Sequence, residues 1–157
     1  MGIAELLTAE GLLTQQIEQI SGDCVTVQVL TEHFGLLDAE QMETLGTHQP
    51  QCLVREVLLM TASKPWVYAQ SLIPQTLLAI HPTLGMLKNR ALGVVLAQTS
   101  GISRGALEYA ELMPHSPLAT RAAASAQLPV RRFWARRSWF AIHDQRLLVQ
   151  EVFIPNG

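Results

Sequence analysis

Charged residues are scarce in this chain, and neither sign dominates. Only 15% of its 157 residues are charged, and 11 basic against 13 acidic side chains give a formal net charge of −2. Nucleic acids and anionic membranes select basic surfaces, so we expect neither as a partner. We interpret the one local group of arginines as a solvated strand edge or loop beside an acidic neighbour: Arg131, Arg132, Arg136 and Arg137.

Cysteine is rare, and long apolar runs are missing. Cys24 and Cys52 each lie in or beside a strand-like apolar segment, as reduced core cysteines do. The first residues lack the basic region and apolar run of a signal peptide, and no stretch approaches the roughly 20 apolar residues that cross a bilayer. We therefore expect a cytoplasmic protein without a membrane span. The length and the 48% hydrophobic content predict a single domain over residues 1–157.

Motifs for common cofactors are missing too. The chain has no phosphate-binding glycine loop, no dinucleotide fingerprint, no Gly-x-Ser-x-Gly elbow and no Cys-x-x-Cys pair. Its five histidines occupy scattered, loop-like positions without i, i+4 spacing. We therefore expect no metal site and no cofactor.

Two predicted β-hairpins organise the chain. The first covers residues 52–74 with its turn at 63–65, and the second joins 133–142 to 147–154 over a turn at 143–146. Around them the pattern predicts an α+β fold with one antiparallel sheet and helices packed on one face. The other expected segments are two short helices within 3–20 with Thr14 as N-cap of the second, a strand at 24–30, a loop with a helical turn at 31–51, a helix and loop at 75–88, and a long loop at 112–130. Periodicity does not decide between strand and helix at 91–97 or 106–112.

In each hairpin, one charged side chain shares a strand face with apolar side chains. Alternate strand residues share a face, so Arg55 lies with Leu53 and Val57, while Glu151 lies with Val149 and Phe153. A buried charge costs several kcal/mol unless it is paired. Each of these two side chains therefore needs a partner from the fold or from a ligand.

Two explanations of these charges remain open. Arg55 and Glu151 could pair with each other, or with Glu56 and Arg137, inside the sheet. Alternatively they line a pocket for a small carboxylate ligand, in which the guanidinium binds the carboxylate in two hydrogen bonds. The glutamate then acts on a hydroxyl or C–H group at the other end of the ligand.

The residues around these charges resemble the chorismate lyase family, which makes 4-hydroxybenzoate for quinone biosynthesis. The similar segments follow one another over nearly the whole chain, in the family's order. They are GLLT at 11–14, VREV at 54–57, PWVYAQS at 65–71, RALG at 90–93, FWARRS at 133–138 and LLVQEVFIP at 147–155.

The resemblance implies helical flaps over a buried ligand site and a reaction that needs no metal. It also implies that Arg55 binds the ring carboxylate, that Glu151 faces the ring oxygen at the opposite end, and that backbone amides at Leu13 and Leu92 complete the site. Arg55 and Glu151 are thus the expected catalytic residues.

A basic group is also needed near the second carboxylate of chorismate, on its enolpyruvyl group. Arg90 and Arg137 are our candidates for that role.

The expected activity is that of a carbon–oxygen lyase acting on a small molecule. A monomer would convert chorismate into 4-hydroxybenzoate and pyruvate, supplying ubiquinone or another quinone. The same fold resembles effector-binding domains of bacterial transcription regulators, which bind ligands without turnover, and this is the alternative. We expect no DNA-binding segment before the domain, and the presence of both Arg55 and Glu151 favours the enzyme.

Overall fold

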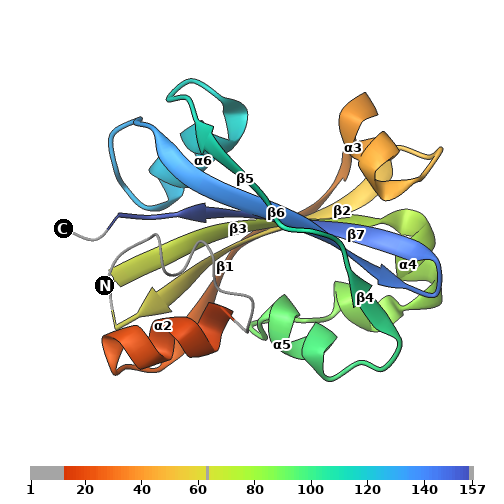
Figure 1. Cartoon of the computed structure of the whole chain (residues 1–157), viewed down its shortest axis with the longest axis horizontal. Coiled ribbons are helices and arrows are strands. Elements are labelled where there is room, and N and C mark those ends of the chain that lie inside the picture. Colours follow the sequence, from red (N-terminus) through yellow and green to blue (C-terminus); the bar gives the residue numbers. More distant parts are fainter. Residues whose placement is uncertain (1–12, 63, 156–157) are drawn as a thin grey trace.

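A single antiparallel sheet forms the centre of the computed structural model, which describes residues 13–62 and 64–155 (Figure 1). Six of the seven strands that the structure describes follow the order β1-β2-β3-β7-β6-β4, and the seventh, β5, also pairs with β6. The strands are β1 (Val25–Leu36), β2 (Gln51–Thr61), β3 (Lys64–Pro74), β4 (Ile102–Arg104), β5 (Glu108–Leu112), β6 (Phe133–Ile142) and β7 (Gln145–Phe153). The helices are α2 (Leu13–Ser21), α3 (Ala39–Leu45), α4 (Gln75–Ile80), the 3₁₀ helix η1 (Pro82–Gly85), α5 (Leu92–Ala97) and α6 (Pro117–Ser125). The predicted α+β class and single antiparallel sheet are confirmed.

Both predicted hairpins are present, and their registers position the charged side chains. Arg55 of β2 pairs with Ser71 of β3, and Glu151 of β7 pairs with Ala69 of β3 on one side and Arg136 of β6 on the other. The β6–β7 turn is shorter than expected, because Ile142 pairs directly with Gln145. The two residues between them have φ values of 48° and 66°, as a type I′ turn requires.

Helices cover both faces of the sheet rather than one. Figure 1 shows α2 and α5 on one side of the sheet and α3 and α6 on the other, with α4 at the end of the strands. The first group packs with Leu53, Val57 and Ile73, and the second with Val54 and Leu58. The physical reason lies in β2, whose residues 52–59 are all buried. A strand that is apolar on both faces needs cover on each side.

Two connections differ from the sequence prediction. β1 continues to Leu36 instead of ending at residue 30, because residues 31–36 pair with β2. The predicted loop at 112–130 contains α6, whose N-cap Ser116 accepts a hydrogen bond from the backbone N–H of Ala119. Pro117 starts that helix, a position where proline costs no backbone hydrogen bond.

The structure decides the two segments whose type the sequence left open. Segment 91–97 is resolved as helical, in α5, and segment 106–112 as extended, in β5. Of the two predicted N-terminal helices, the first falls outside the described residues, and Thr14 lies inside α2 rather than before it.

Cys52 is buried as expected, whereas Cys24 is exposed, and both are free thiols. In the described part of the chain, no helix has the length and apolarity of a membrane span.

The face covered by α6 holds a buried carboxylate, that of Glu56, which is 1% exposed. Arg121 of α6 donates two hydrogen bonds to it, and the hydroxyls of Tyr68 and Thr31 donate as well. Burial by itself would raise the pKa of Glu56, but these donors outweigh burial and lower the pKa. The cluster therefore ties α6 to the centre of the sheet through an ionised glutamate.

Stability should fall in acid because of this carboxylate. A folded-state pKa below the unfolded value means that the unfolded chain binds more protons, so Glu56 stabilises the fold above about pH 4.3 and loses this effect as the pH falls further. Glu56→Gln should cost about 1.5–3 kcal/mol at pH 7. It should also flatten the pH dependence of the free energy of unfolding, as measured by urea denaturation between pH 3 and pH 7.

Glu43→Gln, at an exposed position of α3, is the matched control and should keep the wild-type pH slope. An unchanged slope in Glu56→Gln would contradict this account of the cluster.

Candidate active site

Two adjoining cavities lie between the sheet face that carries Arg55 and the N-terminal ends of α2 and α5. The larger has a volume of about 350 Å³ and the smaller about 70 Å³. Both are lined by Leu13, Leu92, Gly93, Val149 and Glu151. The helix ends and the sheet therefore enclose one continuous site.

Arg55 lies in the smaller cavity and is 2% exposed. Its Nη2 donates to the backbone oxygen of Arg90 at 2.8 Å. Its Nη1 is 3.6 Å from Oε1 of Glu32, and among the described residues it has no hydrogen-bond partner. Burial lowers the pKa of this guanidinium, and Glu32 offsets part of that effect. A buried cation with an unsatisfied donor is suited to bind an anion.

Glu151 is held by Arg136, which we expected at a solvated strand edge or loop. The two residues face each other across β6 and β7, and Nε of Arg136 donates to Oε1 of Glu151 at 2.7 Å. Arg136 is 3% exposed, and its guanidinium stacks over the ring of Phe153 at 5.7 Å. Arg136 therefore fixes one carboxylate oxygen inside the cavity.

The internal pairing considered from the sequence is different in the structure. Arg55 and Glu151 have separate partners, Glu56 binds Arg121, and Arg137 binds Glu40 and Glu108.

Arg55 and Glu151 both line the smaller cavity. The register separates them by two strands and two residues, so their Cα atoms are about 12 Å apart. The sheet surface around the line that joins these two residues carries apolar side chains: Val57, Leu59, Ala69 and Val149. The arrangement offers a guanidinium and a carboxylate on either side of an apolar slot, which suits a flat ligand with a carboxylate at one end and a hydroxyl at the other.

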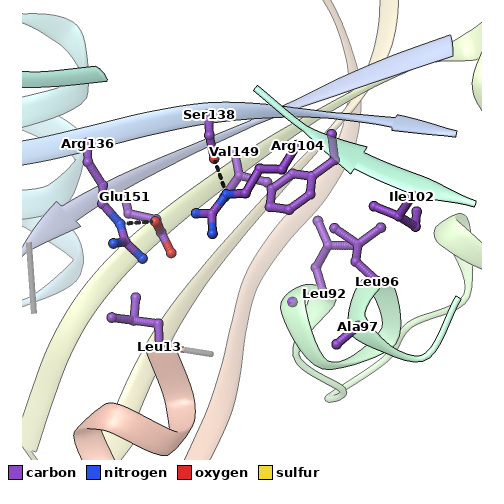
Figure 2. A pocket seen from close by; sticks show the side chains of 12 residues that line it. Leu13, Leu92, Leu96, Ala97, Ile102, Arg104, Arg136, Ser138, Val149 and Glu151 are labelled. Carbon is purple, nitrogen blue, oxygen red and sulfur yellow. Dashed lines mark hydrogen bonds and ion pairs between the residues drawn. The ribbon is translucent and has the colours of Figure 1, made fainter. Parts of the chain in front are cut away.

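The larger cavity contains two side chains that we did not expect in the site, Arg104 and Ser138 (Figure 2). Arg104 comes from β4, and its Nε donates to Oγ of Ser138 at 3.2 Å. In Figure 2 this guanidinium and that of Arg136 point into the same space, above Leu13 and Leu92. The alternation of β6 puts Ser138 on the face of Arg136, but no sequence pattern indicated that the short strand β4 lies beside it.

The other predicted site residues are placed as follows. Leu13 and Leu92 begin α2 and α5, where the first-turn N–H groups have no partner within the helix. Their role as amide donors stays a prediction. Arg90 contributes its carbonyl to Arg55, while its exposed guanidinium turns back to the carbonyls of Leu87 and Met86.

The structure does not bring Arg137 to the site. Arg137 lies on the opposite sheet face, where it binds Glu40 of α3 at 2.7 Å and Glu108 of β5 at 3.0 Å. These contacts raise the pKa of Arg137 and lower that of Glu40 to about 2. Gln70 faces the same way and accepts a hydrogen bond from Gln150.

No group of three or more potential metal ligands occurs within residues 13–62 and 64–155.

This chain is similar to a known protein family over nearly its whole length. The sequence profile of the family described as chorismate lyase matches residues 1–156. A protein of Pseudoalteromonas translucida named "Probable chorismate pyruvate-lyase" is 38% identical over 145 residues, which are 92% of this chain and 79% of that protein. A protein of Halorhodospira halophila with the same name is 33% identical over 159 residues, and the match covers 99% of this chain and 82% of that protein.

Among solved structures, the effector domain of PhnF from Mycobacterium smegmatis superposes with a TM-score of 0.70 over 92% of this chain and 89% of that one. At 14% identity it shares the fold. The family assignment comes from the sequence relatives: with a profile match over residues 1–156 and identities above 30% along most of its length, the chain belongs to the chorismate lyase family of enzymes.

Proposed function

We propose that this protein, as a single domain over residues 1–157, converts chorismate into 4-hydroxybenzoate and pyruvate. The observation that carries the proposal is that buried Arg55, whose Nη1 has no hydrogen-bond partner among the described residues, lines the same apolar slot as the carboxylate of Glu151. The product has the matching shape, a ring with a carboxylate and a hydroxyl in para positions. We further propose that the monomer works in the cytoplasm and supplies quinone biosynthesis.

The reaction is an elimination that makes the ring aromatic. A base takes the proton from the hydroxyl-bearing carbon, and the electron pair of that C–H bond becomes a ring π bond. The neighbouring C–O bond breaks, and its electrons leave on the enolpyruvate oxygen. Enolpyruvate then takes up a proton and becomes pyruvate. The gain of aromaticity drives the step, so the protein mainly has to orient the ring and stabilise charge.

Each residue of the site has a separate role in this reaction. Arg55 binds the ring carboxylate in two hydrogen bonds and sets the position of the ring. Glu151 is the only carboxylate among the described residues that line the two cavities, so we assign to it the contact with the hydroxyl-bearing carbon and the acid–base role. Arg136 positions Glu151.

The test is incubation of the purified protein with chorismate, with and without a chelator. We expect 4-hydroxybenzoate and pyruvate in equal amounts, quantified by chromatography and by coupling to lactate dehydrogenase, and a rate that the chelator leaves unchanged. Saturable binding of chorismate with full recovery of the substrate would instead favour an effector-binding domain. Loss of turnover on chelation, restored by a divalent ion, would refute metal independence.

A further inference from the structure

Near its middle, each of the three central strands places one polar side chain on the apolar sheet face that borders the site. On β2 and β7 these are Arg55 and Glu151, and on β3 it is Ser71. The neighbours of Ser71 on that face, Ala69 and Ile73, are buried, and Ser71 itself is only 5% exposed. A buried hydroxyl is costly unless it has a hydrogen-bond partner. Ser71 therefore needs a partner, as the two charged residues do.

The hydroxyl of Ser71 makes no hydrogen bond with any described residue. The strand register places Ser71 directly beside Arg55, and both line the cavity of about 70 Å³. The other polar side chains in the described lining of that cavity are those of Thr14 and Glu151. Thr14 is partly exposed on α2, whereas Ser71 belongs to the sheet wall. The serine hydroxyl is thus available to a ligand that enters this cavity.

Arg55 does not offer its whole guanidinium to such a ligand. Its Nη2 donates to the backbone oxygen of Arg90, and its Nη1 forms an ion pair with Glu32 at 3.6 Å. A carboxylate has about four acceptor positions on its two oxygens, so a ligand held by the remaining donors of Arg55 can accept from a further group. Directly paired residues have Cβ atoms about 5 Å apart, which puts the hydroxyl of Ser71 next to the carboxylate site.

We propose that the hydroxyl of Ser71 donates a hydrogen bond to the ring carboxylate of the ligand, beside Arg55. This inference rests on the proposed function and adds a substrate-binding residue to its carboxylate site. The serine is a neutral donor, so it strengthens the contact without changing the charge balance between Arg55 and Glu32. Two donors from neighbouring strands fix the rotation of the carboxylate. Because the carboxylate is conjugated with the ring, they also set the plane of the ring relative to Glu151.

The test compares two ligands that share the carboxylate. Ser71→Ala should raise the Kd of 4-hydroxybenzoate about tenfold, because a hydrogen bond to a charged group is lost. The Kd of benzoate, which lacks the 4-hydroxyl group, should rise by the same factor. The free energy of unfolding of the ligand-free variant should not fall, since the hydroxyl has no partner among the described residues. Calorimetric titration and urea denaturation measure these effects.

A pair of larger residues separates the hydroxyl from the shape of the side chain. Ser71→Thr keeps the hydroxyl and should bind both acids nearly as well as the wild type. Ser71→Val has the branching of threonine without the hydroxyl, so it should bind as poorly as Ser71→Ala. Ser103→Ala is the matched control and should leave both Kd values unchanged, since Ser103 is exposed on β4 and outside both cavities.

Three results overturn the inference. Weaker binding of 4-hydroxybenzoate alone would place Ser71 at the hydroxyl end of the ligand. Unchanged Kd values in Ser71→Ala, or equal losses in Ser71→Thr and Ser71→Val, would show that the hydroxyl makes no such bond. A wild type that binds neither acid would remove the carboxylate site itself. The proposed function fails separately, if chorismate is not turned over, because the Kd values of the Ser71 variants are measured without turnover.

Discussion

Glu151→Gln is expected to lower kcat for chorismate by roughly 10²-fold or more. The amide has the size of the carboxylate but can neither accept a proton nor stabilise developing positive charge. The affinity for 4-hydroxybenzoate should fall less, because an amide still hydrogen-bonds the phenol while Arg55 holds the carboxylate. The measurement is steady-state turnover together with equilibrium binding of the product.

The variant should remain folded, since Gln can still accept the hydrogen bond from Nε of Arg136. We expect a loss in the free energy of unfolding of at most about 3 kcal/mol, the upper value for a hydrogen bond to a charged group. Glu111→Gln on β5, outside both cavities, serves as control. Near-normal turnover in folded Glu151→Gln would remove this residue from the mechanism.

Arg55→Ala should abolish most binding of both substrate and product. The substitution leaves the ring carboxylate desolvated and without a partner, which costs about 2–5 kcal/mol in complexes with buried charge pairs. Arg55→Lys should also bind poorly, because an ammonium group cannot form the planar, two-bond contact. Calorimetric titration with 4-hydroxybenzoate measures both losses.

The competing explanation is that Arg55 serves the fold through Glu32, 3.6 Å away. Glu32→Gln separates the two: we expect a much smaller loss of product affinity than in Arg55→Ala, because Glu32 does not line the cavities. If Arg55→Ala gives less folded protein but the folded fraction is fully active, the arginine is structural.

The sequence indicated the site's two principal charges because strand alternation is a short-range property. Arg55 stands between Leu53 and Val57 on one strand face, and this placement depends on no distant contact. The two hairpins were predicted for the same reason. Helices on both faces could have been inferred too, since residues 52–59 are apolar on both sides of Arg55 and Glu56.

The pairing of Arg136 with Glu151 depends on the length of the β6–β7 turn, which the sequence did not indicate. A four-residue turn at 143–146 would have placed Arg136 opposite residue 153, whereas the two-residue turn places it opposite Glu151. An Asn-Gly or Asp-Gly pair usually marks such a turn, but here the two residues with positive φ are His143 and Asp144. The length of this turn therefore decides whether Arg136 lies at the surface or in the site.

Arg104 and α6 were missed for different physical reasons. The three-residue strand β4 is too short for a periodic signal, and its position next to β6 is set by tertiary packing. In the segment of α6, Pro114, Pro117 and Pro129 suggested a loop, yet Pro117 begins the helix and the other two lie outside it. Ser116 at the N-cap was the available helix signal.

The most direct test of the central claim is a single-turnover experiment with wild-type protein in excess over chorismate. We predict that each chorismate yields one 4-hydroxybenzoate and one pyruvate, and that Glu151→Gln slows this conversion under the same conditions. Recovery of unchanged chorismate from a saturated wild-type complex would contradict the account.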